Sequence, residues 1–362
     1  MRFIDEYRDP ALARGLLTGI KRIADQLDRN VAIMEVCGSH TTAIGRFGIR
    51  ALLPENIRLI SGPGCPICVT AAADIDRSLL LARQDGVILA TYGDMLRVPG
   101  CGGMTLQKIK ADHGDIRVVA SPSDAVSLSE KNPDRQVVFL GIGFETTSPT
   151  LAASVLSARE KGINNFSVFS IHKLIPPAMK ILMDDPKLRI DGFLCPGHVS
   201  IIIGADSYRF ITEAGRGAVI TGFEPVDILE GIYMILLQIA GNKPDVVIQY
   251  ARGVKAAGNK KAQEILNVVF EPETTHWRGL GAIPDSGLRF RHEFQDFDAM
   301  ARFSIPDPVS SEPAGCACGD VLKGTITPDQ CPLFKIRCRP DDPVGPCMVS
   351  TDGSCAAYYK YY

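Results

Sequence analysis

Six cysteines lie in the last 47 residues of this 362-residue chain, in a segment with few long apolar runs. Thiolates are soft ligands, and a segment too short to bury its own core often folds around a metal or a disulfide. Structural zinc sites usually contain two closely spaced cysteine pairs, whereas this segment has a single close pair. The spacing therefore favours an iron–sulfur cluster held by four thiolates, which leaves two cysteines free to form a disulfide. The six candidates are Cys316, Cys318, Cys331, Cys338, Cys347 and Cys355.

Two further cysteine motifs follow apolar runs near the start of the chain. The segment CGSHT begins at Cys37 and puts a thiol at the expected first turn of a helix, where backbone N–H groups and the helix dipole favour the thiolate. In GPGCPICVT, two residues separate Cys65 from Cys68, the spacing of thioredoxin-like dithiol switches, which can also bind iron. Buried, unreactive cysteines are the alternative in both cases. The sequence predicts a nucleophile or metal ligand at Cys37, and redox or iron-binding thiols at the C-P-x-C pair.

Acidic and basic side chains occupy later turns of the same kind. GIGFETT lacks the third glycine of the dinucleotide motif and the lysine of the P-loop, so we interpret Glu145 as an acid placed in a cleft. PGHVS offers His198 as a hydrogen-bond partner, a general acid or base, or a metal ligand. His172 has the same position in its own unit, whereas Cys101 and Cys195 are expected to be ordinary small side chains.

Short apolar runs rich in β-branched residues alternate with tight turns and helical stretches. Such alternation predicts mostly parallel sheets with helices on both faces, and strand-to-helix turns that carry the chemistry. We expect two doubly wound, Rossmann-like α/β domains facing a cleft, residues 1–120 and 121–254, and an irregular cysteine-rich domain, 255–362. The expected strands are Val31–Val36, Arg58–Ile60, Val87–Ala90, Ile116–Val119, Val137–Leu140, Ser167–Ser170, Phe193–Leu194 and Ala218–Thr221.

The composition is ordinary for a globular protein, with 46% hydrophobic and 22% charged residues. A net charge of −2 gives no electrostatic signature of nucleic-acid or anionic-membrane binding. The opening MRFIDEYRDP places charges where a signal peptide requires an apolar stretch, and the apolar runs fall short of the roughly 20 residues that span a bilayer. We therefore expect a cytoplasmic protein without a membrane segment, whose thiols serve as ligands or catalytic groups.

The motifs CGSHT, GPGCPICVT, GFETTSPT and PGHVS, followed by the tail pattern CACGDVLKG…CPLF…GPCMVS, occur in an order that resembles the HypD family of hydrogenase maturation factors. The resemblance runs from about Val31 to the C-terminus. It implies a protein that, with the small chaperone HypC, assembles the Fe(CN)2CO unit of [NiFe] hydrogenases and so serves the hydrogenase large subunit indirectly. Cyanide would come from HypE, itself supplied by HypF. The resemblance also implies one [4Fe–4S] cluster in the C-terminal domain.

The resemblance further implies roles for individual residues. Cys37 would hold the Fe(II) that carries cyanide and carbon monoxide, together with a HypC thiolate, and His40 would lie beside it. Cys65 and Cys68 would complete the iron coordination or cycle between dithiol and disulfide. The cluster ligands would be Cys316, Cys331, Cys338 and Cys355, with Cys318 and Cys347 as a redox-active pair. Electrons could then pass from the cluster through this pair to the C-P-x-C thiols by thiol exchange.

Two other functions compete with this assembly scaffold, which is a maturase rather than a conventional turnover enzyme. A [4Fe–4S]-dependent thiol–disulfide reductase explains Cys65 and Cys68, but it leaves CGSHT and PGHVS without a task. A structural metal domain attached to an unrelated nucleotide-binding enzyme is disfavoured by the missing phosphate-binding signature. The scaffold uses every unusual motif, and we therefore prefer it.

Overall fold

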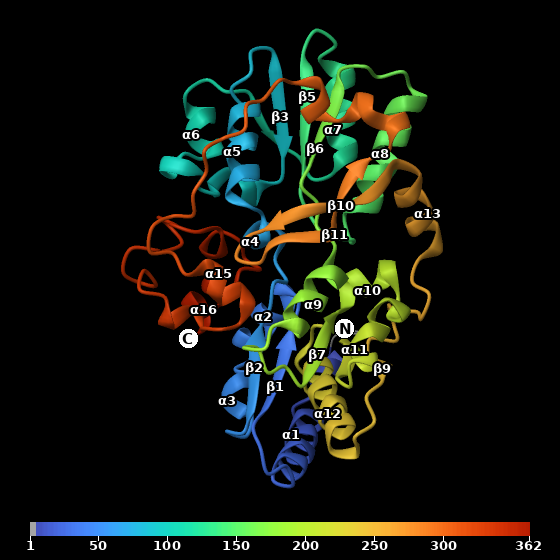
Figure 1. Ribbon diagram of the computed structural model, residues 1–362, viewed down its shortest axis with the longest axis vertical. Coiled ribbons are helices and arrows are strands. Elements are labelled where there is room, and N and C mark those ends of the chain that lie inside the picture. Colours follow the sequence, from blue (N-terminus) through green and yellow to red (C-terminus); the bar gives the residue numbers. More distant parts are fainter. Residues whose placement is uncertain (1–4) are drawn as a thin grey trace.

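The computed structural model describes residues 5–362, so the first four residues of the charged N-terminal segment lie outside it. Two parallel sheets form the framework (Figure 1). Sheet I has the order β2 (Ile57–Ser61), β1 (Val31–Glu35), β7 (Gly192–Pro196), β8 (Gly217–Thr221) and β9 (Val246–Ile248). Sheet II has the order β4 (Ile116–Val118), β3 (Val87–Thr91), β5 (Gln136–Gly141) and β6 (Phe166–Ser170).

Helices flank both sheets, which confirms the predicted α/β class with parallel strands and is consistent with Rossmann-like domains. Polar residues begin several of these helices: Asp9 accepts hydrogen bonds from two N–H groups of the first turn of α1, and Ser121 and Asp124 form a capping box on α7. The helices around sheet I are α1 (Pro10–Ala24), α2 (Gly38–Arg46), α3 (Ile49–Leu52), α10 (Gly197–Ile203), α11 (Arg209–Glu213) and α12 (Pro225–Gly241). Those of the segment that builds sheet II are α4 (Pro66–Val69), α5 (Ala72–Leu81), α6 (Leu106–Ala111), α7 (Pro122–Lys131), α8 (Ser148–Glu160) and α9 (Ile175–Asp184).

All eight predicted strands are present, but their grouping into domains differs from the predicted division at residue 120. β3 and β4 pair with β5 and β6, whereas β1 and β2 pair with β7 and β8. The chain leaves sheet I after β2, builds sheet II, and returns through α9 to add β7, β8 and β9. The division into 1–120 and 121–254 is therefore corrected to a sheet II domain inserted into a sheet I domain. The apolar pattern within each strand does not determine which strands pair, because pairing depends on contacts between residues far apart in the sequence.

The segment after residue 255 is more regular than expected. Helix α13 (Lys260–Val269) packs against α8, and β10 (Phe270–Trp277) and β11 (Gly281–Phe290) form an antiparallel hairpin. Helix α14 (Ala299–Arg302) contacts β6, so residues 260–302 belong with sheet II rather than with the cysteine-rich tail. The tail itself contains α15 (Cys318–Lys323), the 3-10 turn η7 (Pro346–Met348) and α16 (Ser354–Tyr361).

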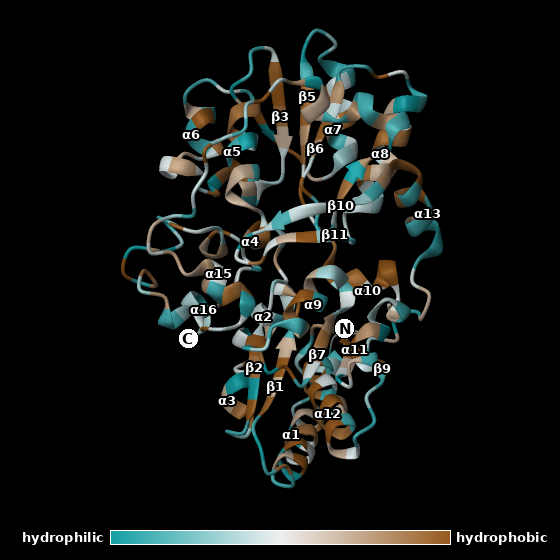
Figure 2. Cartoon of the chain, in the orientation of Figure 1, coloured by the Kyte–Doolittle hydropathy of each residue, from teal (hydrophilic) through white to brown (hydrophobic). Residues whose placement is uncertain are grey.

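The strands of both sheets are strongly apolar (Figure 2), as expected for parallel sheets covered on both faces. One apolar cluster continues from Met34 in sheet I through Leu140 in sheet II to Cys347 in the tail. The arrowheads of β1 and β3 point towards each other across the middle of the molecule (Figure 1). The carboxyl ends of the two sheets therefore face one another across packed side chains. Within residues 5–362, no helix combines the length and apolar character needed to cross a bilayer.

Candidate thiol and metal centre

The turns that carry CGSHT and PGHVS meet where the strand order of sheet I reverses. β1 lies between β2 and β7, so the connections after β1 and β7 leave the sheet in opposite directions, the arrangement that forms ligand sites in open α/β sheets. Cys37 immediately precedes α2, and His198 lies in the first turn of α10. Sheet II reverses in the same way between β3 and β5, and the GFETT segment follows β5.

The Cys37 turn and the C-P-x-C turn are in direct main-chain contact. The N–H of Gly38 donates to the carbonyl of Gly64 at 3.0 Å. Gly64 has no room for a side chain, because a Cβ there would lie 2.3 Å from the Cys37 nitrogen. The next residue, Cys65, forms a disulfide with Cys68, with 5.3 Å between their Cα atoms. The predicted proximity of the C-P-x-C thiols to Cys37 therefore has a clear structural basis.

The thiol of Cys37 is buried, and this reverses the expectation that the helix N-terminus favours its ionised form. Burial raises the pKa of Cys37 to about 12, although the backbone N–H groups of Ser39 and His40 act in the opposite direction. Beneath this turn, Glu35 accepts hydrogen bonds from the Cys37 N–H at 3.3 Å and from the Thr41 hydroxyl at 2.5 Å. Loss of bulk water thus outweighs the helix terminus, and the free thiol is held in its protonated form.

His40 and His198 come together through a residue that the sequence did not single out. The Phe223 ring stacks on His198 at 4.0 Å and on His40 at 4.8 Å between centroids. His40 Nε2 lies 3.0 Å from the Thr221 hydroxyl and 3.0 Å from the Gly222 carbonyl oxygen. Burial lowers the pKa of His40 to about 4, which keeps its imidazole neutral. The only indication of Phe223 in the sequence is its position two residues after the predicted strand Ala218–Thr221.

Glu145 lies in the packed interior, with 3% of its surface exposed, rather than in an open cleft. One carboxylate oxygen accepts the Ile175 N–H at 2.9 Å, and the other has no hydrogen-bond partner. Burial raises the pKa of Glu145 to about 7. Glu145 is therefore held inside the protein against Ile175, the first residue of α9.

All six tail cysteines line one small pocket, together with the apolar side chains of Leu333, Phe334 and Met348. Soft sulfur donors in an apolar, enclosed pocket fit an iron–sulfur cluster. Within residues 5–362, no group of three His, Cys, Asp or Glu side chains is close enough to hold a single metal ion. An iron–sulfur cluster is larger than one ion, so its cysteine ligands lie farther apart. The residues present therefore fit the group that the sequence predicted, although the cluster itself stays a prediction.

A hydrogen bond joins the two members of the predicted redox pair. Cys318 Sγ donates to Cys347 Sγ at 2.9 Å. Hydrogen bonds with Cys316 and Cys347 lower the pKa of Cys318, and the same contact with Cys318 raises the pKa of Cys347. Cys318 and Cys347 are thus in contact, but Cys318 also hydrogen-bonds to Cys316 and Cys347 to Cys355, so the division of the six thiols stays a prediction.

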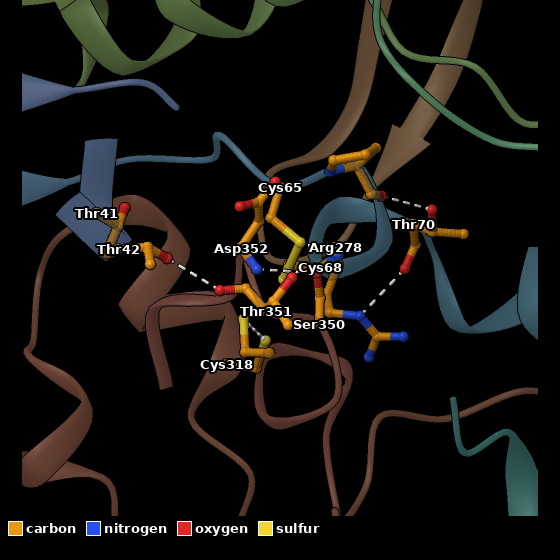
Figure 3. Close-up of a disulfide and its surroundings, with 12 residues drawn as sticks. Thr41, Thr42, Cys65, Cys68, Thr70, Arg278, Cys318, Ser350, Thr351 and Asp352 are labelled. Carbon is orange, nitrogen blue, oxygen red and sulfur yellow. Dashed lines mark hydrogen bonds between the residues drawn. A yellow bond between two sulfur atoms is a disulfide. The ribbon is translucent and has the colours of Figure 1, made fainter. Parts of the chain in front are cut away.

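The tail docks directly on the Cys37 turn. The Thr42 hydroxyl donates to the Thr351 carbonyl at 2.9 Å, and a Cβ on Gly38 would lie 2.3 Å from Asp352 Cβ (Figure 3). Helix α4, which carries Cys68, contacts both α15 and η7, the elements that carry Cys318 and Cys347. Sequence reasoning missed Thr351 and Asp352, since no spacing rule relates a tail loop to the first motif. Cys37, the C-P-x-C disulfide and the tail thiols therefore meet at one junction.

A cavity of about 600 Å³ lies apart from this junction, between α5, the end of β6 and the hairpin. Lys173 and Asp74 line it, with 3.7 Å between the ammonium and carboxylate groups. Burial lowers the pKa of Lys173, and Asp74 partly offsets this effect. None of the predicted site residues lines this cavity.

Together, the fold and the site define a class: a two-sheet α/β protein with a cysteine-rich tail docked against thiol-bearing turns. The HypD family, described as "Hydrogenase formation hypA family", matches residues 11–362. The chain is 46% identical to the hydrogenase maturation factor HypD of Azotobacter vinelandii, with all of this chain and 97% of that protein aligned. It is 44% identical to HypD of Escherichia coli K12, with all of this chain and 98% of that protein aligned. The chain belongs to the HypD family of hydrogenase maturation factors.

Proposed function

We propose that this chain binds and assembles the Fe(CN)2CO unit of [NiFe] hydrogenases, in a complex with HypC that shares the iron. The observation that carries the proposal is the junction at which Cys37, the C-P-x-C disulfide and the tail thiols meet. Cyanide would arrive from HypE acting with HypF, and the hydrogenase large subunit would receive the completed unit. The site of action would be the cytoplasm.

The chemistry of this cargo suits the surroundings of Cys37. Cyanide and carbon monoxide are strong-field ligands, and the electron-rich iron that binds them favours soft thiolate donors away from water. Cys37 is buried beside neutral His40 and against the C-P-x-C turn. Iron binding would displace the thiol proton and thus overcome the raised pKa, because a metal stabilises the thiolate directly.

The tail would supply electrons to this site. Cys316, Cys331, Cys338 and Cys355 would hold a [4Fe–4S] cluster, and Cys318 and Cys347 would form the exchangeable pair beside it. The contact between Cys318 and Cys347, and the packing of α4 against their two elements, support this relay. Exchange would move a disulfide between this pair and Cys65–Cys68 without an external reagent.

Infrared spectroscopy tests the proposal. The protein is purified anaerobically, alone and co-expressed with HypC, HypE and HypF, and scanned for metal-bound cyanide and carbonyl stretches. Wild-type protein should show the bands, Cys37→Ala should lose them, and Cys195→Ala should keep them, because Cys195 is a buried cysteine with no role in the proposal. If a cluster is present and the bands never appear, the thiol–disulfide reductase becomes the better account.

A further inference from the structure

The tip of the β10–β11 hairpin is wedged between the C-P-x-C helix and the first helix of the tail. The backbone N–H of Arg278 donates to the Val69 carbonyl at 2.8 Å, directly after Cys68. On the opposite side, Gly279 adopts a φ of +77°, and a Cβ there would lie 2.5 Å from the Cα of Gly319. Gly319 follows Cys318, so the tip makes main-chain contacts beside both thiol pairs.

The side chain of Arg278 extends towards Thr70, at the end of α4 (Figure 3). Only 3% of the residue is exposed, and its Nε donates to the Thr70 carbonyl at 3.1 Å. The guanidinium also pairs with Glu312 in the extended segment without secondary structure that leads to the tail. Burying a positive charge costs free energy unless hydrogen bonds or an opposite charge compensate for the loss of water. A hairpin turn by itself does not require a buried arginine. The position of this charge therefore calls for a reason beyond turn formation.

The tip is held firmly from the sheet II side. Trp277 is buried and stacks on Phe144 of the GFETT segment, with 6.1 Å between ring centroids. Its indole N–H donates to the Ser286 hydroxyl at 2.9 Å, which ties the two hairpin strands together. The tip is thus fixed from the sheet II side, and it places Arg278 against the end of α4 and beside Glu312.

We propose that Arg278 is a positioning residue for thiol–disulfide exchange between the Cys318–Cys347 pair and the Cys65–Cys68 pair. Arg278 ties the end of α4 to the segment at Glu312 that leads into the tail thiols, so that a sulfur of one pair can reach the other. This role rests on the relay proposed above, and it adds a residue that no cysteine motif contains.

The exchange itself is balanced within the chain. The Cys318 thiolate attacks the Cys68 sulfur, which forms a mixed disulfide and releases Cys65 as a thiolate. Cys347 then attacks the Cys318 sulfur, closes the Cys318–Cys347 disulfide and releases Cys68. Two electrons pass from one pair to the other, and the protons lost by the first pair are matched by those that the second pair takes up.

The test measures exchange between the pairs in the full-length anaerobic protein. Oxidised protein receives one equivalent of dithiothreitol, samples are quenched with acid and alkylated over time, and mass spectrometry follows the thiols of each pair. In Arg278→Met the pairs should equilibrate at least about tenfold more slowly than in wild type, since small misplacements of reacting groups have effects of this size or larger. Arg278→Lys, which keeps the charge, should recover part of the rate.

Arg289→Met is the matched control, because Arg289 lies on the same hairpin but pairs with Glu271 at the surface. It should exchange at the wild-type rate. A wild-type rate in Arg278→Met overturns the role of Arg278. If that variant does not fold, Glu312→Gln replaces it, because it removes the charged partner of the guanidinium, and a wild-type rate there overturns the role. If the Cys318–Cys347 and Cys65–Cys68 pairs of the wild-type protein never equilibrate, the relay is refuted, and so is the role of Arg278.

Discussion

Replacing Gly64 with alanine perturbs the contact between the Cys37 turn and the C-P-x-C turn. The added Cβ would lie 2.3 Å from the Cys37 nitrogen and 2.4 Å from its Cα. Ordinary carbon contacts are about 3.5 to 4.0 Å, so one of the turns must move by about 1 Å. Because the obstructing atoms belong to the backbone, no side-chain rotation relieves the clash. Overpacking of this kind costs roughly 1–3 kcal/mol.

The assay pairs thermal unfolding with the rate of iodoacetamide alkylation at Cys37. Gly64→Ala should lower the apparent unfolding midpoint, and it should speed alkylation because the turn that covers Cys37 is displaced. Gly15→Ala is the control: its Cβ would meet nothing within 4 Å, and alanine in a helix is favoured over glycine by roughly 0.5–1 kcal/mol. A Gly64→Ala protein with the wild-type midpoint and alkylation rate would refute the contact.

Three further predictions concern the metal centres and the buried acid. Cys37→Ala should abolish iron carriage and leave the cluster intact, as iron and sulfide analysis would show; joint loss of both would contradict separate sites. Cys338→Ala should bleach the visible absorption of the cluster, and a full [4Fe–4S] spectrum would remove it from the ligand set. The raised pKa of Glu145 means that its contribution to stability, present below pH 4.5, is lost as the pH rises through about 7. Glu145→Gln should therefore stabilise the protein above pH 7 by up to about 3 kcal/mol relative to its effect at pH 4.5, and an equal effect at both pH values would disprove this linkage.

The sequence predicts the local elements of this fold well, because each strand depends on short-range patterning. Val87–Ala90 and Val137–Leu140, for example, match β3 and β5 within one residue at either end. The assembly of those strands was predicted wrongly, since the alternation of strand and helix continues unchanged across the boundary between the sheets. The β10–β11 hairpin was missed, although the glycines at 279 and 281 between its strands are a typical hairpin signal.

The candidate site shows a similar limit. The resemblance to the HypD family, and not cysteine spacing, implied the pair Cys318 and Cys347, and the structure places their sulfurs in contact. The backbone N–H groups at the start of α2 lower the pKa of Cys37 as expected, but burial outweighs them, and the degree of burial is not visible in a sequence. Arg278 also escaped notice, since an arginine in a polar stretch resembles a surface residue until the tail is docked against it.

The central claim is that one chain holds two separate iron sites, and Mössbauer spectroscopy of ⁵⁷Fe-labelled protein co-expressed with HypC, HypE and HypF tests it most directly. Wild-type protein should give a low-spin Fe(II) signal together with that of a four-iron cluster. In Cys37→Ala the low-spin signal should disappear while the cluster signal stays. A low-spin signal that survives in Cys37→Ala, or that vanishes only together with the cluster, would contradict the account.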